Sequence, residues 1–382
     1  MLAIAMSRQA RPGALLRDNI PCFDDHFVRQ IAPLAGPLPL NNPNLLMKIF
    51  RGFQHPGLAS ACALTIGNFD GVHRGHQAML ALLRGEAQQR GIPSCVLTFE
   101  PHPRDYFAQR AQEPALAPAR VGTLRDKLLD LAQCGIDQTV VLPFQNSLAQ
   151  LSAQDFIDRI LTRGLGARYV LVGDDFRFGA RRSGDYALLD AAGEAQGFDV
   201  ARMNSYEVHG LRVSSSEVRQ ALGQGDMAQA ARLLGRPYRI SGHVVHGRKL
   251  GRELGFRTLN LRFAHWKPAA GGIFVVRVHG LAPEPLAGVA NMGVRPSLDA
   301  SDVNGGRVLL ETHCLDWPAE LGSEGAYGKL IRVELLHKLH DELRYDSLES
   351  LRAGISRDCD DARSFLSSAH ARTHRQTTRD RI

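Results

Sequence analysis

The sequence predicts an α/β protein of two domains: a doubly wound parallel sheet, then a small antiparallel β-barrel with a terminal helix. Between residues 47 and 236, apolar strand-like runs alternate with stretches whose apolar residues have helical spacing. After residue 237 the runs are strand-like, closely spaced and separated by glycine and proline, which favours a barrel. At 382 residues, the chain is long enough for each domain to have its own core.

The first domain is predicted to begin at Met47 and end at Arg236. Its strands should be short runs of β-branched and other apolar residues, and its helices should repeat apolar residues three and four positions apart. In a sheet of this kind, ligands bind at the carboxyl ends of the strands. The expected strands are 62–66, 94–99, 139–142 and 169–172, and helices are expected around 77–83, 124–131 and 156–161.

The second domain is predicted for residues 237–369. Its strands are separated by turn residues rather than by helices, and one helix closes the domain. The expected strands are 238–245, 273–279, 286–291, 308–313 and 331–336, and the helix carries Leu348, Leu351, Ile355, Ala362 and Leu366 on one face.

Both ends of the chain fall outside this pattern. Residues 1–46 are rich in proline and arginine and lack apolar periodicity. We expect them to be a disordered extension, or the product of an upstream start with Met47 as the natural first residue. Residues 370–382 are polar and basic, and we expect them to form a disordered tail.

Composition and charge narrow the class of function. The net charge of +7 is spread along the chain, which suits a phosphorylated small molecule better than a nucleic acid. The six cysteines contain no C-x-x-C pair, which argues against a zinc or dithiol site. No run approaches roughly 18 apolar residues, and the N-terminus lacks a signal layout. We therefore expect a cytoplasmic protein, monomeric or weakly homo-oligomeric, with neither a membrane nor a nucleic acid as partner.

The segment Gly67–His76, GNFDGVHRGH, follows a strand-like run and precedes a helix-like one. A glycine-rich loop at a helix start points free backbone N–H groups and the positive end of the helix dipole at an anion. His73 and His76 lie one helical turn apart and offer imidazoles to phosphates as charge develops during transfer. The alternative is a tight turn with no chemical role.

Two further clusters in the same domain suit a nucleotide. The segment 173–179, GDDFRFG, follows a strand-like run and carries carboxylates and an arginine, and residues 214–219, SSSEVR, begin a helix. The alternatives are an ordinary loop after a strand and simple helix capping. Three clusters suited to phosphate within one α/β domain nevertheless favour a nucleotide site.

These motifs, in this order, make the first domain similar to the adenylyltransferase half of bacterial bifunctional riboflavin kinase/FAD synthetases. The match also includes Met47–Gly52 and Thr98–Pro103. The resemblance implies a Rossmann-like nucleotidyltransferase domain in which His73 and His76 act on the phosphates and Asn146 lies on the flavin side. The ATP-binding residues that it implies are Gly67, Phe69, Asp70, Asp174, Arg177, Ser215, Ser216 and Arg219.

The second domain resembles the riboflavin kinase module of the same family. The similarity lies in five segments: Gly247–Asn260, Gly288–Ser297, Leu310–His313, Tyr327–Lys329 and Lys338–Tyr345. It implies a kinase-type barrel that phosphorylates the ribityl chain of riboflavin.

The resemblance also implies roles for residues of this second domain. Glu311 would be the general base that accepts the proton of the attacking hydroxyl, although an isolated glutamate in a strand is more often a solvent-facing charge. Thr258 and Asn260 would hold Mg²⁺ through neutral oxygens. The implied ATP-binding residues are Gly247, Gly251, Gly255 and Thr258, and the implied flavin-binding residues are Arg295, Glu342 and Arg344.

The chain departs from the family pattern next to the metal-binding turn, where Arg257 and Leu259 replace proline and alanine. Proline would stiffen the turn, whereas arginine brings a charge that could reach an ATP phosphate. We predict a working kinase with an altered nucleotide grip, because Thr258, Asn260 and Glu311 are all present. The alternative is a weakened kinase module.

The family resemblance implies an enzyme that phosphorylates riboflavin to FMN and adenylylates FMN to FAD, with ATP as co-substrate and Mg²⁺ as cofactor. The first site has no residue that looks like a covalent nucleophile, so we expect direct in-line attack by the FMN phosphate. One alternative is an adenylyltransferase with an impaired kinase module. Another is an adenylyltransferase whose acceptor is pantetheine phosphate or nicotinamide mononucleotide, but that function would leave the barrel domain unexplained. A nucleic-acid-binding protein would instead show steeply salt-dependent binding without ATP consumption.

Overall fold

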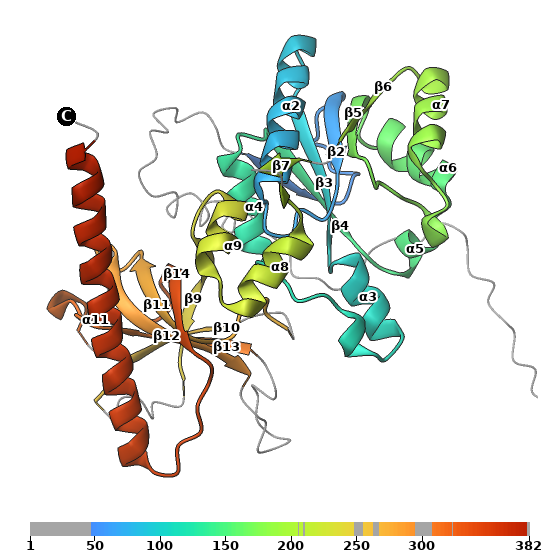
Figure 1. Cartoon of the computed structure of the whole chain (residues 1–382). Helices are drawn as coiled ribbons and strands as arrows, with labels where there is room; N and C mark the ends of the chain where they lie inside the picture. Colours follow the sequence, from blue (N-terminus) through green and yellow to red (C-terminus); the bar gives the residue numbers. More distant parts are fainter. Residues whose placement is uncertain are drawn as a thin grey trace, which may run out of the picture.

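Figure 1 shows the computed structural model, which describes residues 47–204, 206–208, 211–247, 255–262, 267–294, 308–322 and 324–379. For residues 369–379 only the backbone is described. The expectations for residues 1–46 and 380–382, for Gly251 and for Arg295 therefore lie outside the described residues.

Six parallel strands form the first sheet, in the order β1-β4-β3-β2-β5-β6. From the central strand β2 the chain adds β3 and β4 on one side and β5 and β6 on the other. The connections after β2 and β5 therefore run in opposite directions, which makes this the switch point where such sheets bind ligands. All five residues of β2 are buried, since both faces of the sheet are covered. The strands are β1 (Lys48–Arg51), β2 (Cys62–Ile66), β3 (Ser94–Glu100), β4 (Gln138–Pro143), β5 (Ala167–Gly173) and β6 (Asp199–Met203).

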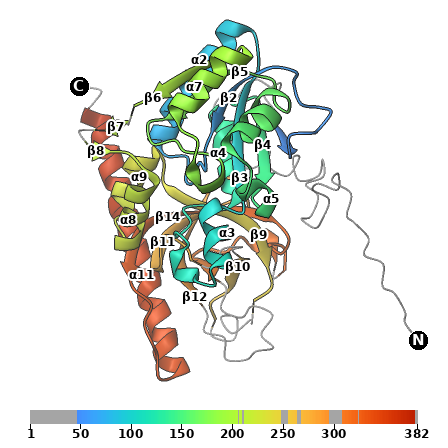
Figure 2. The same cartoon turned by 90° about the vertical axis from the view of Figure 1, so that its right-hand side faces the viewer.

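Helices cover both faces of this sheet (Figures 1 and 2). On one face, α2 (Arg74–Arg90) and α4 (Leu124–Gln133) bury leucines against it. On the other, α7 (Tyr186–Gln196) and the π-helical segment Phe156–Thr162 do the same. The remaining short elements are α3 (Pro103–Arg110), α5 (Asn146–Ala149), α6 (Ala153–Asp155), the 3₁₀ turns Pro114–Leu116 and Ala180–Arg182, and the hairpin β7 (Glu207–Val208) and β8 (Leu211–Arg212).

The second sheet closes on itself as a six-stranded barrel, in the order β10-β13-β12-β11-β14-β9. Every described strand pair in it is antiparallel. The predicted fold class is thus confirmed in both halves, although the sequence analysis had not assigned a strand to β10. The strands are β9 (Tyr238–Val245), β10 (Thr258–Arg262), β11 (Gly272–His279), β12 (Leu286–Val294), β13 (Val308–Cys314) and β14 (Leu330–His340), with a 3₁₀ turn at Ala319–Leu321.

The last helix, α11 (Leu348–Arg379), runs along the outside of the barrel (Figure 1). Cys359 and Ala362 of this helix pack against Val275 and Val289 of the barrel wall. The backbone stays helical through Arg379, whereas the sequence analysis expected a disordered tail from residue 370. Extending an existing helix fixes one residue for each new hydrogen bond, without a second nucleation cost.

The two halves of the chain share a core and a polar interface. Helices α8 (Ser215–Gln224) and α9 (Met227–Leu234) lie between the sheet and the barrel in Figure 1, and their apolar faces join the barrel core. On the polar side, Asp126 of α4 accepts a hydrogen bond from the N–H of Ser241 at 2.9 Å. Asp130 of α4 pairs with Arg236 and Arg239 at the start of β9. Within the part of the chain that the structure describes, no helix combines the length and apolarity needed to cross a bilayer.

Candidate active sites

The loop between β2 and α2 has an unusual backbone conformation. Phe69 and Val72 have φ angles of 48° and 40°, a region that β-branched residues above all rarely adopt. Gly71 has a φ of 88°, and a Cβ atom there would come within 2.7 Å of the Val121 side chain, so only glycine fits. Such conformations persist where the surroundings enforce them, and they cluster at binding and catalytic sites. The carboxyl end of β2 is therefore the first candidate site.

Two stacked histidines begin α2. The ring of His73, the N-cap residue, accepts a hydrogen bond at Nδ1 from the backbone N–H of His76, at 3.3 Å. The two ring centroids are 3.7 Å apart, and the ring of Phe69 lies 4.9 Å from His76. A Cβ at Gly67 would come 3.1 Å from the Phe69 ring, so glycine leaves room for this packing. Because Nδ1 of His73 is an acceptor, the neutral ring carries its proton on Nε2, which can donate to a ligand.

Burial keeps both histidines neutral at pH 7. Burial lowers the pKa of His73 to about 4, although the nearby Asp70 acts in the opposite direction. Burial, together with the charges of His73 and Lys127, lowers the pKa of His76 well below its ordinary value. Nδ1 of His76 is buried and has no hydrogen-bond partner among the described residues. The pair thus offers N–H donors that strengthen as negative charge develops, rather than fixed positive charges.

A third histidine, His102, gives a testable consequence of this neutrality. Its Nδ1 caps α3 by accepting from the N–H of Arg104 at 3.1 Å, and burial lowers its pKa to about 3. In the unfolded chain a histidine takes up its proton near pH 6.5, so between there and about pH 4 the unfolded state binds more protons than the folded state. As the pH is lowered through this window, the free energy of unfolding should therefore decrease, by up to about 1.4 kcal/mol per pH unit for each such group.

We predict that His102→Asn makes this pH dependence shallower. Asparagine can still cap α3, but it does not titrate. Thermal unfolding followed from about pH 7.5 down to about pH 5 should show a smaller loss of melting temperature in the variant than in the native protein. Equal slopes would contradict the buried neutral state of His102.

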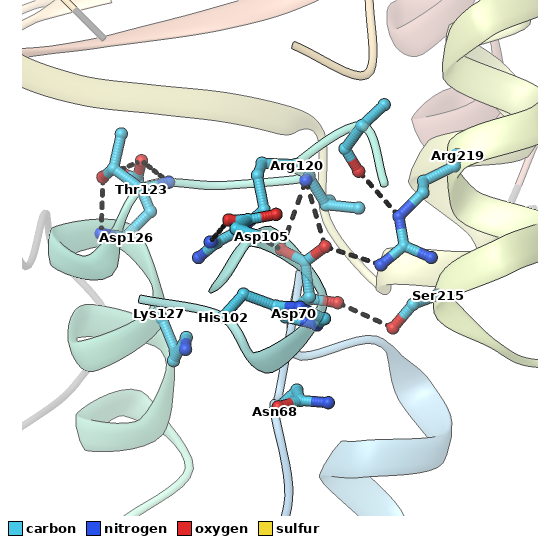
Figure 3. A network of polar contacts seen from close by, with 12 residues as sticks. Asn68, Asp70, His102, Asp105, Arg120, Thr123, Asp126, Lys127, Ser215 and Arg219 are labelled. Carbon is cyan, nitrogen blue, oxygen red and sulfur yellow. Dashed lines mark hydrogen bonds and ion pairs between the residues drawn. The ribbon is translucent and has the colours of Figure 1, made fainter. Parts of the chain in front are cut away.

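Asp70 is the centre of the polar network in Figure 3. Its buried carboxylate accepts hydrogen bonds from the N–H of Val121 at 3.2 Å and from Nη2 of Arg219 at 2.8 Å. Its backbone carbonyl accepts from the hydroxyl of Ser215 at 3.0 Å. Burial raises the pKa of Asp70, but Arg120 and Arg219 outweigh it and hold the pKa below its ordinary value. Asp70 thus ties the loop after β2 to the start of α8, which brings two of the three sequence clusters together.

Two buried cations that the sequence analysis missed complete this network. Arg120 donates to Asp105 at 2.7 Å and to Glu100 at 3.3 Å, and its Nε lies 3.8 Å from Asp70. Lys127 lies 4.0 Å from Glu100, and burial lowers its pKa to about 8. Because these cations are buried among carboxylates, they hold the site together as well as making it positive.

The third cluster predicted from the sequence is the loop after β5. Its charged side chains form ion pairs outside the Asp70 network. Asp174 is exposed and pairs with Arg212 at 3.8 Å. Arg177 pairs at 3.1 Å with Asp185, the N-cap residue of α7, so its guanidinium is directed to that helix. Ser216 is exposed on the first turn of α8.

An aromatic cluster lies at the carboxyl ends of β3 and β4. Phe144 makes edge-to-face contacts with Tyr106 and Phe107, with ring centroids 5.5 and 5.8 Å apart. Phe107 is 51% exposed, which is unusual for so large an apolar side chain. Beside the cluster, Arg110 donates a hydrogen bond to the side-chain oxygen of Asn146. An exposed aromatic face beside polar groups suits a planar heteroaromatic ligand.

In the barrel, Asn260, Glu311 and Asn291 form a row across three strands. Glu311 of β13 is paired with Asn260 of β10 on one side and with Asn291 of β12 on the other. Residues paired in this way place their side chains on one face, roughly 5 Å apart. The side-chain oxygens of Asn260 and Asn291 are buried, and neither accepts a hydrogen bond from the residues that the structure describes. Buried acceptors are normally satisfied, so this row is the second candidate site.

The oxygen donors at this end of β10 fit Mg²⁺. Thr258 and Asn260 are two residues apart on one strand and therefore share a face. A Cβ at Gly247 would come 2.5 Å from the amide nitrogen of Asn260, so glycine permits this close approach, and Gly255 has a φ of 87° in the turn before the strand. A hydroxyl and an unpartnered amide oxygen are hard donors of the kind that Mg²⁺ takes alongside phosphate oxygens. No cluster of three or more His, Cys, Asp or Glu side chains suited to a metal occurs among the described residues.

Arg257 is engaged beside this turn. Its guanidinium donates to the carbonyl of Gly322 at 3.0 Å and lies 5.2 Å from the centre of the Trp317 ring. Its own carbonyl is 2.9 Å from Nδ1 of His313. The sequence suggested that this charge could reach an ATP phosphate; in the structure the guanidinium contacts Gly322 and Trp317. These contacts fix the residue that precedes Thr258.

Glu342, one of the expected flavin-binding residues, lies against the barrel wall near the row. A Cβ at Gly293 would come 1.8 Å from a carboxylate oxygen of Glu342, so this approach requires glycine. Gly293 is two residues from Asn291 on β12 and thus on the same face of the strand. Arg344 is exposed in the segment that follows β14.

Two protein-family models match the chain, one on each half. The model described as FAD synthetase matches residues 56–217, which include the histidine loop, Asp70 and Arg120. The model described as riboflavin kinase matches residues 234–366, which include the barrel and the first part of α11.

Relatives match both halves together. The chain is 44% identical over 322 residues to the bifunctional riboflavin kinase/FMN adenylyltransferase of Escherichia coli K12, covering 84% of this chain and 98% of the relative. It is 44% identical over 330 residues to the protein of that name from Pseudomonas fluorescens, covering 85% and 100%. A crystal structure of a macrolide-efflux protein from Streptococcus pneumoniae superposes with a TM-score of 0.64 at 24% identity, over 83% of this chain and 99% of that one, which supports the fold alone.

Proposed function

The chain belongs to the family of bifunctional riboflavin kinase/FMN adenylyltransferases, and we propose that its two reactions take place at the two sites described above. It is a transferase that phosphorylates riboflavin to FMN and then adenylylates FMN to FAD, with ATP as co-substrate in both steps. The observation that carries the proposal is that each module holds a site with buried polar atoms that lack a hydrogen-bond partner among the described residues.

For adenylyl transfer, a phosphate oxygen of FMN attacks the α-phosphorus of ATP. The bond from that phosphorus to the oxygen bridging to the β-phosphate breaks, and pyrophosphate leaves. We propose that His73 and His76 donate N–H groups to the phosphates as charge moves to the leaving group. Arg219 and Ser215, both anchored by Asp70, then hold ATP at the start of α8.

The flavin of FMN is assigned to the aromatic cluster at the ends of β3 and β4. The exposed ring of Phe107 and the neighbouring Phe144 offer surfaces against which the isoalloxazine can stack. Asn146, already bonded to Arg110, supplies polar contacts at the rim. We propose that the flavin binds at the same edge of the sheet as the histidines, so that its phosphate can approach the α-phosphorus of ATP.

For phosphorylation, the ribityl hydroxyl of riboflavin attacks the γ-phosphorus of ATP, its proton passes to Glu311, and ADP leaves. Asn260 and Asn291 flank that carboxylate and orient the reacting oxygens. We propose that Thr258 and Asn260 hold Mg²⁺. When bound, Mg²⁺ neutralises part of the charge on the ATP phosphates.

The proposal is tested by incubating the pure protein with riboflavin, ATP and Mg²⁺ and separating the flavins by chromatography over time. FMN should appear first and FAD should follow, each with its own consumption of ATP. Accumulation of FMN without FAD, or unchanged riboflavin beside full conversion of added FMN, would contradict the assignment of both activities. We place the enzyme in the cytoplasm because it consumes ATP and its described cysteines are free thiols.

We predict that Arg257 supports the kinase by fixing the turn before Thr258. Arg257→Ala removes both the hydrogen bond to Gly322 and the contact with Trp317, so ordering the turn around ATP becomes more costly. The ATP KM of riboflavin phosphorylation should rise by about 30-fold, since the charge-assisted hydrogen bond and the cation–π contact are each worth about 1 kcal/mol.

Arg257→Pro separates stiffness from charge at the same position. Proline restores a rigid residue before Thr258 without the guanidinium, so its ATP KM should be lower than that of Arg257→Ala. A native chain without kinase activity that is rescued by proline would overturn this account, because Arg257 would then have impaired the module.

A further inference from the structure

The short segment Ala119–Val121 links the two modules at the adenylyl-transfer site. It lies between the 3₁₀ turn Pro114–Leu116 and α4, and Figure 3 shows it above the Asp70 carboxylate. Each of its three residues binds a different part of the molecule. The carbonyl of Ala119 accepts a hydrogen bond from Nε of Arg219 at 2.7 Å, and the N–H of Val121 donates to Asp70 at 3.2 Å.

The backbone of Arg120, in the middle of this segment, is paired with the barrel module. Its N–H donates to the carbonyl of Lys267 at 3.0 Å, and its carbonyl accepts from the N–H of Ala269 at 3.1 Å. Together they form a parallel bridge between Arg120 and Pro268. Ala269 and Ala270 are buried in the core that α8 and α9 share with the barrel. This burial holds the segment of residues 267–270 in place.

The side chain of Arg120 points the other way, into the first module. It is 3% exposed and contacts three carboxylates, those of Asp70, Glu100 and Asp105. Buried charges of this kind are tolerated only when they are paired, so a shift of Arg120 would leave carboxylates unbalanced beside the histidines. The position of this side chain is set by a backbone that the barrel holds.

We propose that residues 267–269 of the kinase module form part of the adenylyl-transfer site, by clamping the backbone of Arg120 so that Arg120 and Val121 position Asp70. Arg120 is a positioning residue: it acts on Asp70, and Asp70 in turn holds Arg219 and Ser215 at the start of α8. The inference rests on the assignment of adenylyl transfer to the histidine site. It adds that FAD synthesis in one module depends on the docking of the other.

The first test is Arg120→Met, which keeps an unbranched side chain but removes the guanidinium and its charge. The kcat for FAD formation from FMN should fall by about 10–100-fold, because small displacements of groups that align a reaction cost rates of that size. The KM for FMN is measured alongside, because Asp105 and Glu100, two partners of Arg120, adjoin the aromatic cluster. Arg120→Lys should recover part of the rate, and riboflavin phosphorylation should remain normal in both variants. Arg90→Lys, at the far end of α2 where Arg90 pairs with Asp199, is the matched control and should behave as the native chain.

The second test is Ala269→Pro, which removes the N–H that binds the carbonyl of Arg120. Its riboflavin kinase activity shows whether the barrel still folds. With that activity retained, FAD formation should fall as in Arg120→Met, and the double variant should be no slower than Arg120→Met alone, because both act through one link.

Normal FAD formation in Arg120→Met, or in an Ala269→Pro protein with an active kinase, would overturn the proposal. If Ala269→Pro loses the kinase as well, the kcat of Arg120→Met decides the question. A failed assignment of the histidine site gives a different result, since His76→Ala would then leave FAD formation intact.

Discussion

Replacing His76 with alanine should lower FAD formation by on the order of 10²–10³-fold, the usual cost of removing one donor that stabilises developing charge. His76 stacks on His73 at 3.7 Å and is kept neutral by burial, so its loss removes a donor from the transition state. The Gly67–His76 loop follows a strand of the parallel sheet and the Asn260–Glu311–Asn291 row lies on the barrel, so the two sites belong to different modules. Riboflavin should therefore still be converted to FMN, which accumulates.

The measurement is a time course of the three flavins with riboflavin, ATP and Mg²⁺, repeated with FMN as the starting flavin. His55→Ala is the matched control, because His55 is exposed in the loop after β1, where its ring accepts a hydrogen bond from the N–H of Gly57 and lies 5.0 Å from the Phe50 ring. A folded His76→Ala protein that loses both steps equally, or that makes FAD at the native rate, would refute the separation of the two sites.

Glu311→Gln should lower the conversion of riboflavin to FMN by roughly 10²–10⁴-fold, since glutamine keeps the size and hydrogen-bonding capacity of the side chain but cannot accept the proton. Glu311 stands between Asn260 and Asn291 in the strand register, so the amide can occupy the same place. Added FMN should still be adenylylated at the native rate.

The control for this variant is Glu284→Gln, which makes the same chemical change in an exposed turn between β11 and β12. Initial rates of FMN formation from riboflavin compare the two proteins, and thermal unfolding checks that both are folded. Near-native kinase turnover in Glu311→Gln would show that this carboxylate is not the base.

The local parts of the first site could be predicted from the sequence. The expected strand 62–66 coincides with β2, and the glycine-rich loop and helix start follow it as expected. Strand, loop and helix are set by neighbours in sequence, through apolar periodicity and capping. The helix begins at Arg74, ahead of the expected range 77–83, and His73 caps it.

The buried cations of the same site could not be predicted in this way. Val121, next to Arg120, is 51 residues from Asp70 in sequence, and only the fold brings the two segments together. An arginine or lysine in an otherwise ordinary stretch gives no local sign that it will be buried among carboxylates. The Thr98–Pro103 motif, which contains Glu100, was the one sequence feature that pointed toward this part of the network.

The Asn260–Glu311–Asn291 row in the barrel could not be predicted from the sequence for the same reason. Asn260, Asn291 and Glu311 come from three separate strands, and each is unremarkable where it stands in the sequence. The register of an antiparallel pair decides which residues face each other, and a slip of one residue would send Glu311 to the opposite face. Asn291 therefore escaped the sequence analysis, although its motif had been noted as part of the family resemblance.

The most direct test of the two-site account is to mix His76→Ala and Glu311→Gln in one tube with riboflavin, ATP and Mg²⁺, and to measure FAD. Each variant alone should fail to convert riboflavin to FAD, the first stopping at FMN and the second leaving riboflavin unchanged. Together they should make FAD, because FMN released by one protein is the substrate of the other. A mixture of the two folded variants that makes no more FAD than either alone would contradict two separate catalytic sites.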